Sequence, residues 1–294
     1  MLIPTDRAWD EAYSRIEPFF TVFSTDRDYA DSLKKQQVSL AIVSDLVYRG
    51  KITHPEEQAF LTSTYPLYPG TFISGPAALF AGSVATEASN GMYFVTDALN
   101  LNPVETWNKP LVVEAETTTG RVTGPNTGVY TKQAESGKWE VSEYYYVTVQ
   151  PENNPSAQPA VTFAIPQTLS GKYDIYAEFI PFDGFENDST KLLFEITYLR
   201  ANGSTATQLV NTANLVTSGT EKVAIKAFSA FEFPVSNYYD WLWQNQYFEG
   251  KYTVDDRIVY TKLMVKTNVT NAEKNSGKFS RRFNIDRIIL IPAN

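Results

Sequence analysis

The chain has 294 residues, 43% of them hydrophobic, so it can bury one large core or two ordinary ones. The absence of cysteine excludes disulfides, cysteine nucleophiles and thiolate metal sites together. A formal net charge of −8 argues against nucleic acid or an anionic membrane as a partner, because both bind a basic face.

The first twenty residues predict a short strand that runs into a helix. Residues 2–4 are apolar, and Thr5 or Asp6 is placed to cap a helix behind them. The apolar residues that follow recur every three to four positions, as one buried helix face requires: Trp9, Tyr13, Ile16 and Phe20.

A second helix is predicted further along. Residues 24–26, Ser-Thr-Asp, are expected to begin a new segment, and residues 38–48 are rich in apolar side chains. Gly50 follows where a left-handed cap would end this helix. Thr53 and Glu56 have the spacing of a capping box and predict another helix start.

The stretch from Ser89 to Leu101 organises the first hundred residues. Asn90-Gly91 is a strong signal for a primed hairpin turn, which needs positive φ at both central residues. Strand-forming residues continue from Met92 to Thr96. Before them, residues 71–73 predict a short strand and residues 76–80 a short helix. The Asn90–Thr96 region is therefore expected to be the closing strand of a mixed α and β domain.

The pattern changes between Trp107 and Pro110. Beyond this point strand alternation replaces helical spacing, so a domain boundary is expected here. Alternating apolar positions predict buried strand faces at Tyr173, Ile175, Ala177 and Phe179, at Phe194, Ile196 and Tyr198, and at Phe283, Ile285, Ile289 and Ile291.

Further strands and turns complete an all-β pattern. Residues 141–149 and 161–165 are expected to pair around the loop 150–156, and Asn202-Gly203 and Ser218-Gly219 mark turns. The fold class predicted for residues 109–294 is an antiparallel β-sandwich or jelly roll.

Two motifs in the first half resemble fasciclin domains. Residues 3–9, Ile-Pro-Thr-Asp-Arg-Ala-Trp, are similar to the first fasciclin motif, and residues 90–97, Asn-Gly-Met-Tyr-Phe-Val-Thr-Asp, to the second. The resemblance implies an α+β fasciclin-like domain over residues 1–106. The Tyr-His pair linked to integrin binding in that family should fall just before Gly50. Asp45 and Leu46 stand there instead, so that activity is not carried over.

Fasciclin domains usually begin with helices that precede the first motif, whereas Met1 leads almost directly into it. We therefore expect a longer natural precursor that supplies these helices, a secretion signal and a lipidated cysteine as anchor. The chain as given opens with no signal sequence, and no apolar run in it approaches the roughly 18–20 residues of a membrane span.

The second half resembles family 6 and family 35 carbohydrate-binding modules, which are galactose-binding-like sandwiches. The similar segments are residues 113–116, 170–176 and 283–288, which match the opening, middle and closing strands of such modules. In these families a structural calcium often lies near the opening glutamates and the closing aspartate. The resemblance thus nominates Glu114, Glu116 and Asp286, which are hard oxygen donors of the kind calcium prefers. Solvated charges at strand ends are the alternative interpretation.

The richest aromatic segment is residues 238–248, where six aromatic side chains alternate with amides and one carboxylate. Flat rings beside amides are what sugar recognition requires, and packing against the rest of the protein is the alternative. The candidate ligand-binding residues are Tyr238, Tyr239, Trp241, Trp243, Asn245 and Tyr247. Trp139 with Tyr144 is a second candidate, and strand alternation would place Tyr145 inside and its neighbours outside.

No residue pattern in the sequence strongly indicates a catalytic site. His54 is the only histidine, and its position in a first helical turn favours the surface. Paired carboxylates for glycoside hydrolysis need only two acids at a set separation. An acidic loop at Asp183, Glu186 and Asp188 and the pair Asp255-Asp256 offer such acids, which solvated turns also explain.

The resemblances together imply a non-enzymatic protein, extracellular or at a bacterial outer-membrane surface. Its role would be adhesion or polysaccharide capture beside a glycan uptake system, with a surface glycan or another surface protein as partner. A structural interaction protein without a sugar site and a glycoside-active enzyme remain the alternatives.

Overall fold

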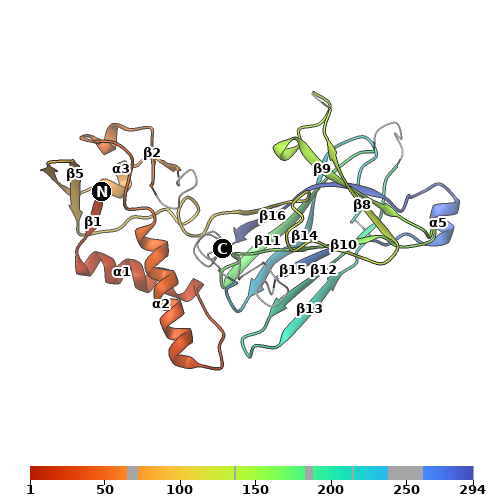
Figure 1. Cartoon of the computed structure of the whole chain (residues 1–294), viewed down its shortest axis with the longest axis horizontal. Coiled ribbons are helices and arrows are strands. Elements are labelled where there is room, and N and C mark those ends of the chain that lie inside the picture. The colour runs from red at the N-terminus through yellow and green to blue at the C-terminus, as the bar shows by residue number, and fades with distance from the viewer. Residues whose placement is uncertain (65–71, 136, 183–187, 214, 238–260, 294) are drawn as a thin grey trace. The chain divides into compact units, whose positions relative to one another are not determined.

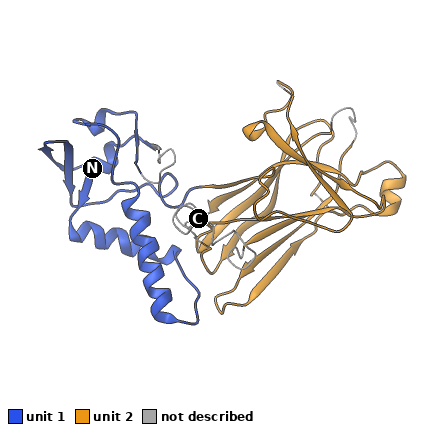
Figure 2. Cartoon of the chain, viewed as in Figure 1, with its two compact units in different colours: residues 1–109 blue, residues 110–294 orange. Residues whose placement is uncertain are grey.

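The computed structural model describes residues 1–64, 72–135, 137–182, 188–213, 215–237 and 261–293. Contacts divide the chain into two units, Met1–Lys109 and Pro110–Asn294 (Figure 2). The division falls in the Pro-bearing connection where the sequence changes from helical to strand spacing. No helix in the described ranges is both long and apolar enough to cross a membrane.

The first unit mixes short strands and helices. Its elements are β1 (Leu2–Pro4), α1 (Asp6–Ile16), η1 (Glu17–Phe19), α2 (Arg27–Val43), η2 (Pro55–Glu57), β2 (Phe60–Thr62), β3 (Phe72–Ser74), α3 (Ala77–Phe80), β4 (Val84–Ala88) and β5 (Gly91–Thr96) (Figure 1). Strand β5 lies between β1, to which it is parallel, and β4, to which it is antiparallel. The strand expected to organise this half is therefore the central strand of its three-stranded sheet.

Helix α1 begins where the sequence predicts. The Thr5 side chain accepts a hydrogen bond from the backbone N–H of Ala8, which satisfies one of the donors left open at a helix start. The buried face carries Ala8, Ala12 and Ile16. Of the predicted face, Trp9 and Tyr13 are only half-buried, and Phe20 is buried but lies beyond the helix end. The strand-to-helix entry predicted for residues 2–20 is confirmed.

The second helix differs from its predicted bounds. Helix α2 begins behind Asp26, whose carboxylate accepts from the N–H of Tyr29, and it ends at Val43 rather than at Tyr48. Gly50 has a φ of +83° but lies beyond the helix end and does not cap it. The capping box expected from Thr53 is also wrong, because only the three-residue turn η2 forms and no side chain caps it.

The hairpin of β4 and β5 forms, but its turn is displaced by one residue. Ala88 pairs with Gly91, so Ser89 and Asn90 are the two loop residues. Neither Asn90 nor Gly91 has the positive φ of the predicted primed turn. The hairpin prediction is confirmed and its turn type is wrong.

The second unit is a two-sheet antiparallel sandwich. Its elements are β6 (Leu111–Glu114), β7 (Val122–Thr123), β8 (Thr127–Gln133), η3 (Ser142–Tyr144), β9 (Tyr145–Pro151), β10 (Ala160–Ala164), β11 (Gly171–Ile180), β12 (Leu192–Leu199), β13 (Thr205–Val210), β14 (Val223–Phe233), β15 (Lys262–Thr267), α5 (Asn271–Asn275) and β16 (Phe283–Ala293). One sheet has the order β13-β12-β15-β10-β7, and the other β14-β11-β16-β9-β8, with β6 also on β16.

The core of this unit lies between the two sheets. Strand β11 alternates as predicted, with Tyr173, Ile175, Ala177 and Phe179 all buried. Edge-to-face ring contacts such as Phe179 with Phe283, 5.8 Å between centroids, join the strands of one sheet. The burial of these apolar side chains is the main favourable contribution to the folding free energy of such a sandwich.

Two strand predictions in this unit are wrong. In β16, Ile288 and Leu290 enter the core in place of Ile289 and Ile291, because the register against β11 shifts at Asp286. This shift is a β-bulge, which moves the residues beyond it to the other face. Strands β9 and β10 do not pair, since the loop between them crosses from one sheet to the other.

Candidate functional site

The acids nominated for calcium gather around the bulge of β16. Glu114 ends β6 and stands opposite Arg287, the residue after Asp286. The bulge turns Asp286 into a fully buried position. Strand pairing across β6 and β16 thus positions the opening and closing acids at one end of the sandwich.

Ser142 connects two of these acids. Its backbone N–H donates to Asp286 Oδ1 at 3.1 Å, and its hydroxyl donates to Glu114 Oε1 at 2.7 Å. Lys222 Nζ lies 2.9 Å from Asp286 Oδ2 and 2.8 Å from Glu178 Oε2. Asp286 is therefore held by a backbone donor and a cation, whereas Glu114 has only the hydroxyl.

Burial and like charge act on the two glutamates in the same direction. Burial raises the pKa of Glu114, and the Ser142 hydrogen bond opposes it. Burial also raises the pKa of Glu116, and the neighbouring Glu114 adds to the rise. Glu114 Oε2 and Glu116 Oε2 are buried and accept no hydrogen bond.

The charges around the cluster leave a negative excess. Five carboxylates interact there, while three cationic side chains oppose them: Glu114, Glu116, Glu143, Glu178 and Asp286 against Arg121, Lys222 and Arg287. A divalent cation would neutralise the remaining two charges. The unpartnered oxygens of Glu114 and Glu116 fit a hard cation, whereas Asp286 is already paired with Lys222.

A different group of ligand types is closer together in the first unit. Within the described ranges, His54, Glu56 and Glu57 are the one set of three whose donor atoms lie within 4.8 Å of one another. All three are exposed, and His54 Nδ1 lies 3.3 Å from Glu56 Oε1. The surface position predicted for His54 is confirmed, and solvated acids of this kind are common without a metal.

The main aromatic candidates, from Tyr238 to Tyr247, lie outside the described residues. Of the second candidate, Trp139 is half-buried with an indole N–H that has no acceptor, and Tyr144 is 75% exposed. The prediction for Tyr145 is wrong: it is exposed, and Tyr146 is the buried residue. The reason is local, since Glu143 and Tyr144 both have positive φ and delay the strand start.

The acids considered for catalysis are only partly described. Asp183, Glu186 and the Asp255-Asp256 pair lie outside the described residues. Asp188 accepts a hydrogen bond from Arg282 Nε as one half of an ion pair. This pairing favours a structural role for Asp188 at the loop.

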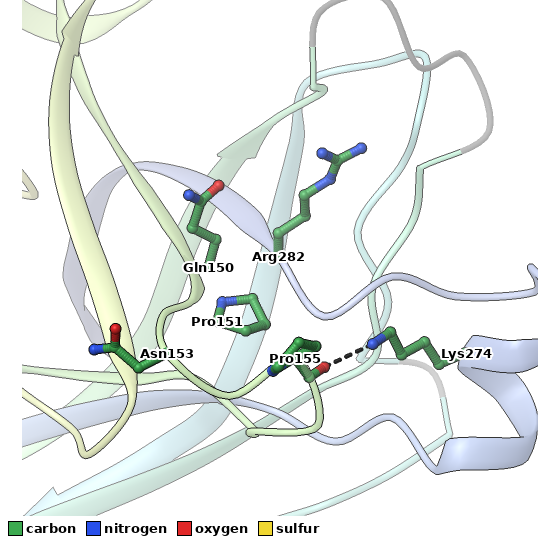
Figure 3. Close-up of a pocket in the computed structure, with 6 residues that line it drawn as sticks. All are labelled: Gln150, Pro151, Asn153, Pro155, Lys274 and Arg282. Atoms are coloured by element: carbon green, nitrogen blue, oxygen red, sulfur yellow. Dashed lines mark hydrogen bonds between the residues drawn. The ribbon is translucent and has the colours of Figure 1, made fainter.

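A pocket that the sequence did not predict lies on the other end of the β9 strand. It has a volume of about 480 Å³ and is lined by Gln150, Pro151, Asn153, Pro155, Lys274 and Arg282 (Figure 3). Asn153 has a left-handed φ of 62°, which asparagine tolerates and which turns the loop after β9. Figure 3 shows Gln150 and Arg282 extending in the same direction, with the two prolines beneath them.

Tyr130 borders this pocket from strand β8. Gly128 pairs with Gln150, and the Tyr130 ring lies over Gly128, where a methyl group would come 2.7 Å from Cε2. The Tyr130 hydroxyl donates to Glu152 Oε1 at 2.8 Å, and Glu152 lies between two pocket residues. The ring is 42% exposed, so a ligand can reach it.

A second hollow of about 350 Å³ adjoins the pocket. It shares Pro151, Lys274 and Arg282 and continues along the connection from α5 to β16. The Arg282 guanidinium lies 4.5 Å from the centre of the Phe182 ring and is fixed by Asp188. We call the two hollows together the β9–α5 pocket.

The residues that line the β9–α5 pocket come from strands and loops that are far apart in the chain, so no single sequence motif predicts the pocket. Two signals were nevertheless present. Gly128 stands two positions before Tyr130, on the same strand face, and residues 274–282 contain four cationic side chains in an acidic chain. Neither signal identifies the partner loop.

No family model and no curated protein matches the chain. Similar solved structures include the GH26-CBM35 β-(1,4)-mannanase of Podospora anserina, with 14% identity over 63% of this chain and 28% of that chain, and a TM-score of 0.32. Another is the C-terminal family 22 carbohydrate-binding module of Clostridium thermocellum Xyn10B, with 11% identity over 64% and 94% and a TM-score of 0.37.

A third is the CBM22 tandem domain of Paenibacillus barcinonensis Xyn10C, with 12% identity over 62% and 45% and a TM-score of 0.36. The chain thus spans 28% of the mannanase and 45% of the tandem domain. TM-scores this low do not assign a fold, so the β-sandwich rests on the strand order above. The fasciclin resemblance finds no support in these comparisons.

Proposed function

We propose that residues 110–294 form a non-catalytic glycan-binding module and that the protein acts outside the cell, at a bacterial surface, in adhesion or polysaccharide capture. The observation that supports this most is the β9–α5 pocket. Two amides and two apolar proline rings line it, and the exposed Tyr130 ring lies beside it on the neighbouring strand. Sugar sites need this mixture of apolar faces and directed polar groups.

Each side chain has a defined part in the proposed binding. The Tyr130 ring, which lies close to Gly128 and is partly exposed, offers a face for the apolar C–H side of a sugar. The amides of Gln150 and Asn153 can donate to and accept from hydroxyl groups. The Pro151 and Pro155 rings give further apolar area without any loss of side-chain freedom.

We also propose that Glu114 and Glu116 hold a structural calcium ion in this module. When bound, the ion would neutralise two half-buried carboxylates that otherwise repel each other. Ser142 would position the site, because its hydroxyl already orients Glu114 and its backbone N–H is held by Asp286. The ion stabilises the sandwich in this proposal and takes no part in chemistry.

Affinity electrophoresis of the full chain through gels that contain soluble polysaccharides tests the proposed function. At least one polysaccharide should retard the wild type, and Tyr130→Ala should lose that retardation. Tyr29→Ala is the matched control, since Tyr29 is an exposed tyrosine of the first unit. Tyr144→Ala tests the alternative surface near Trp139.

The proposal is wrong if no polysaccharide of a broad neutral and acidic panel retards the wild type. It is also wrong for the β9–α5 pocket if Tyr144→Ala abolishes retardation while Tyr130→Ala leaves it intact. Melting curves of all three variants accompany the gels, because an exposed ring contributes little to the core.

A further inference from the structure

The wall of the β9–α5 pocket that follows α5 is basic, although the chain as a whole carries a net charge of −8. Lys274, Lys278, Arg281 and Arg282 all fall within residues 274–282. The larger hollow, which Lys274 and Arg282 line, has no carboxylate among the described residues that line it. In the smaller hollow, Asp188 is the one acid among the described lining residues, and it is paired with Arg282.

Arg281 contributes a buried positive charge to this wall. Its side chain is only 5% exposed, and its guanidinium donates to neutral acceptors: Val269 O at 2.9 and 2.7 Å, Ser156 O at 2.7 Å and Asn271 Oδ1 at 2.8 Å. These bonds tie the loop after β9 to the connection after β15. Because neutral carbonyls do not cancel the charge, its field extends into the adjacent hollow.

Lys274 places a second cation at the junction of the two hollows. Its ammonium group donates to Pro155 O at 2.6 Å, which fixes Nζ at the pocket wall, as Figure 3 shows. An ammonium group has three donors and no acceptor, so a carboxylate or sulfate oxygen can share it with this carbonyl. Lys278 lies between two lining residues of the smaller hollow, Gly277 and Phe279, and its Nζ is 5.4 Å from the centre of the Phe279 ring.

We propose that the β9–α5 pocket binds an anionic group of an acidic polysaccharide, either the carboxylate of a uronic acid or a sulfate ester. This inference rests on the proposed glycan-binding function and names its ligand class. Lys274 is the direct contact, and Arg281 and Lys278 raise the local potential. A polyanion is repelled by the rest of this acidic chain, so a local cluster of cations is what makes its binding favourable.

Affinity electrophoresis of the full chain with matched pairs of polymers tests this inference. Polygalacturonate is compared with the same polymer after reduction of its carboxyl groups, and dextran sulfate with dextran. We expect retardation by at least one charged member of a pair and weaker retardation by its neutral partner. The pair that shows the difference identifies carboxylate or sulfate as the group that is bound.

Two variants locate the contact. Lys274→Gln should weaken the apparent affinity for the charged polymer at least about fivefold, and Lys278→Gln by less. Lys172→Gln, an exposed lysine on β11, is the matched control and should behave as the wild type. Far-ultraviolet circular dichroism melts confirm that each variant is folded.

Two outcomes would overturn the inference alone: charged and neutral partners that retard the chain equally, or Lys274→Gln binding the charged polymer as tightly as Lys172→Gln does. In either case, retardation by any polymer that Tyr130→Ala abolishes leaves the proposed function standing. Failure of every polymer, charged or neutral, overturns both.

Discussion

Gly128→Ala is a selective way to displace the Tyr130 ring from the border of the β9–α5 pocket. A methyl group at residue 128 would lie 2.7 Å from Cε2, 2.8 Å from Oη and 3.0 Å from Cζ of Tyr130, which is closer than real methyl contacts. The ring must therefore move, and because it is 42% exposed it can swing into solvent. Binding should fall by about 1–3 kcal/mol, or roughly 5- to 150-fold in Kd, as for the loss of a central aromatic contact.

The free energy of unfolding should change little in the same variant. Gly128 lies within strand β8, where alanine is allowed, and such a replacement stabilises by about 0.4–1 kcal/mol through the unfolded chain. Loss of the exposed hydrogen bond from Tyr130 to Glu152 costs about 0.5–1.5 kcal/mol and offsets this gain.

Titration calorimetry with the retained polysaccharide and urea unfolding measure the two effects. Tyr130→Ala and the double variant complete a cycle, in which the double variant should bind no more weakly than Tyr130→Ala alone. If Gly128→Ala binds as tightly as the wild type, or if the two losses are additive, the ring is not the contact that the pocket presents.

Three further predictions concern the sandwich itself. Calcium should raise the melting temperature of the wild type and not that of Glu116→Gln. In calcium-free buffer at neutral pH, Glu116→Gln should melt higher than the wild type. The reason is that burial raises the pKa of Glu116, so the ionised carboxylate lowers the stability of the wild type as pH rises above about 4.5. An equal calcium response in both proteins would argue against the site. Hydrogen bonds from Lys191 lower the pKa of Glu273 to about 2, so its contribution to stability should be present above pH 4.5 and lost as pH falls toward 2; Glu273→Gln should flatten this part of the urea-unfolding profile, and an unchanged profile would contradict it. Residues 110–294 alone should unfold cooperatively with a β-type circular dichroism spectrum, and an insoluble or molten fragment would show that the two units share one core.

Local patterns in this sequence predicted some elements correctly and failed for others. Thr5 caps α1, and the alternation of β11 from Tyr173 to Phe179 faces the core, because caps and period-two alternation depend on neighbouring residues alone. The same reasoning failed in β16, where the bulge at Asp286 moves Ile289 to the outer face. A bulge depends on the partner strand, which the sequence of one strand does not contain.

Contacts between residues that are far apart in the chain were harder to predict from the sequence. The loop after β9 was expected to close a hairpin, but its length also allows the chain to cross between sheets, and it does so. Glu114 and Asp286 were placed near each other only through a resemblance, and the Lys222 pairing of Asp286 was not foreseen. The β9–α5 pocket was missed because Gln150 and Lys274 meet only in the folded chain.

Hydrogen exchange of the full chain, with and without a polysaccharide that retards it, locates the binding surface directly. We predict that protection on binding is greatest in peptides that cover residues 128–133, 150–155 and 274–282, which form the β9–α5 pocket and its Tyr130 border. Protection confined to residues 139–145 or 238–248, with none along the β9–α5 pocket, would contradict this account.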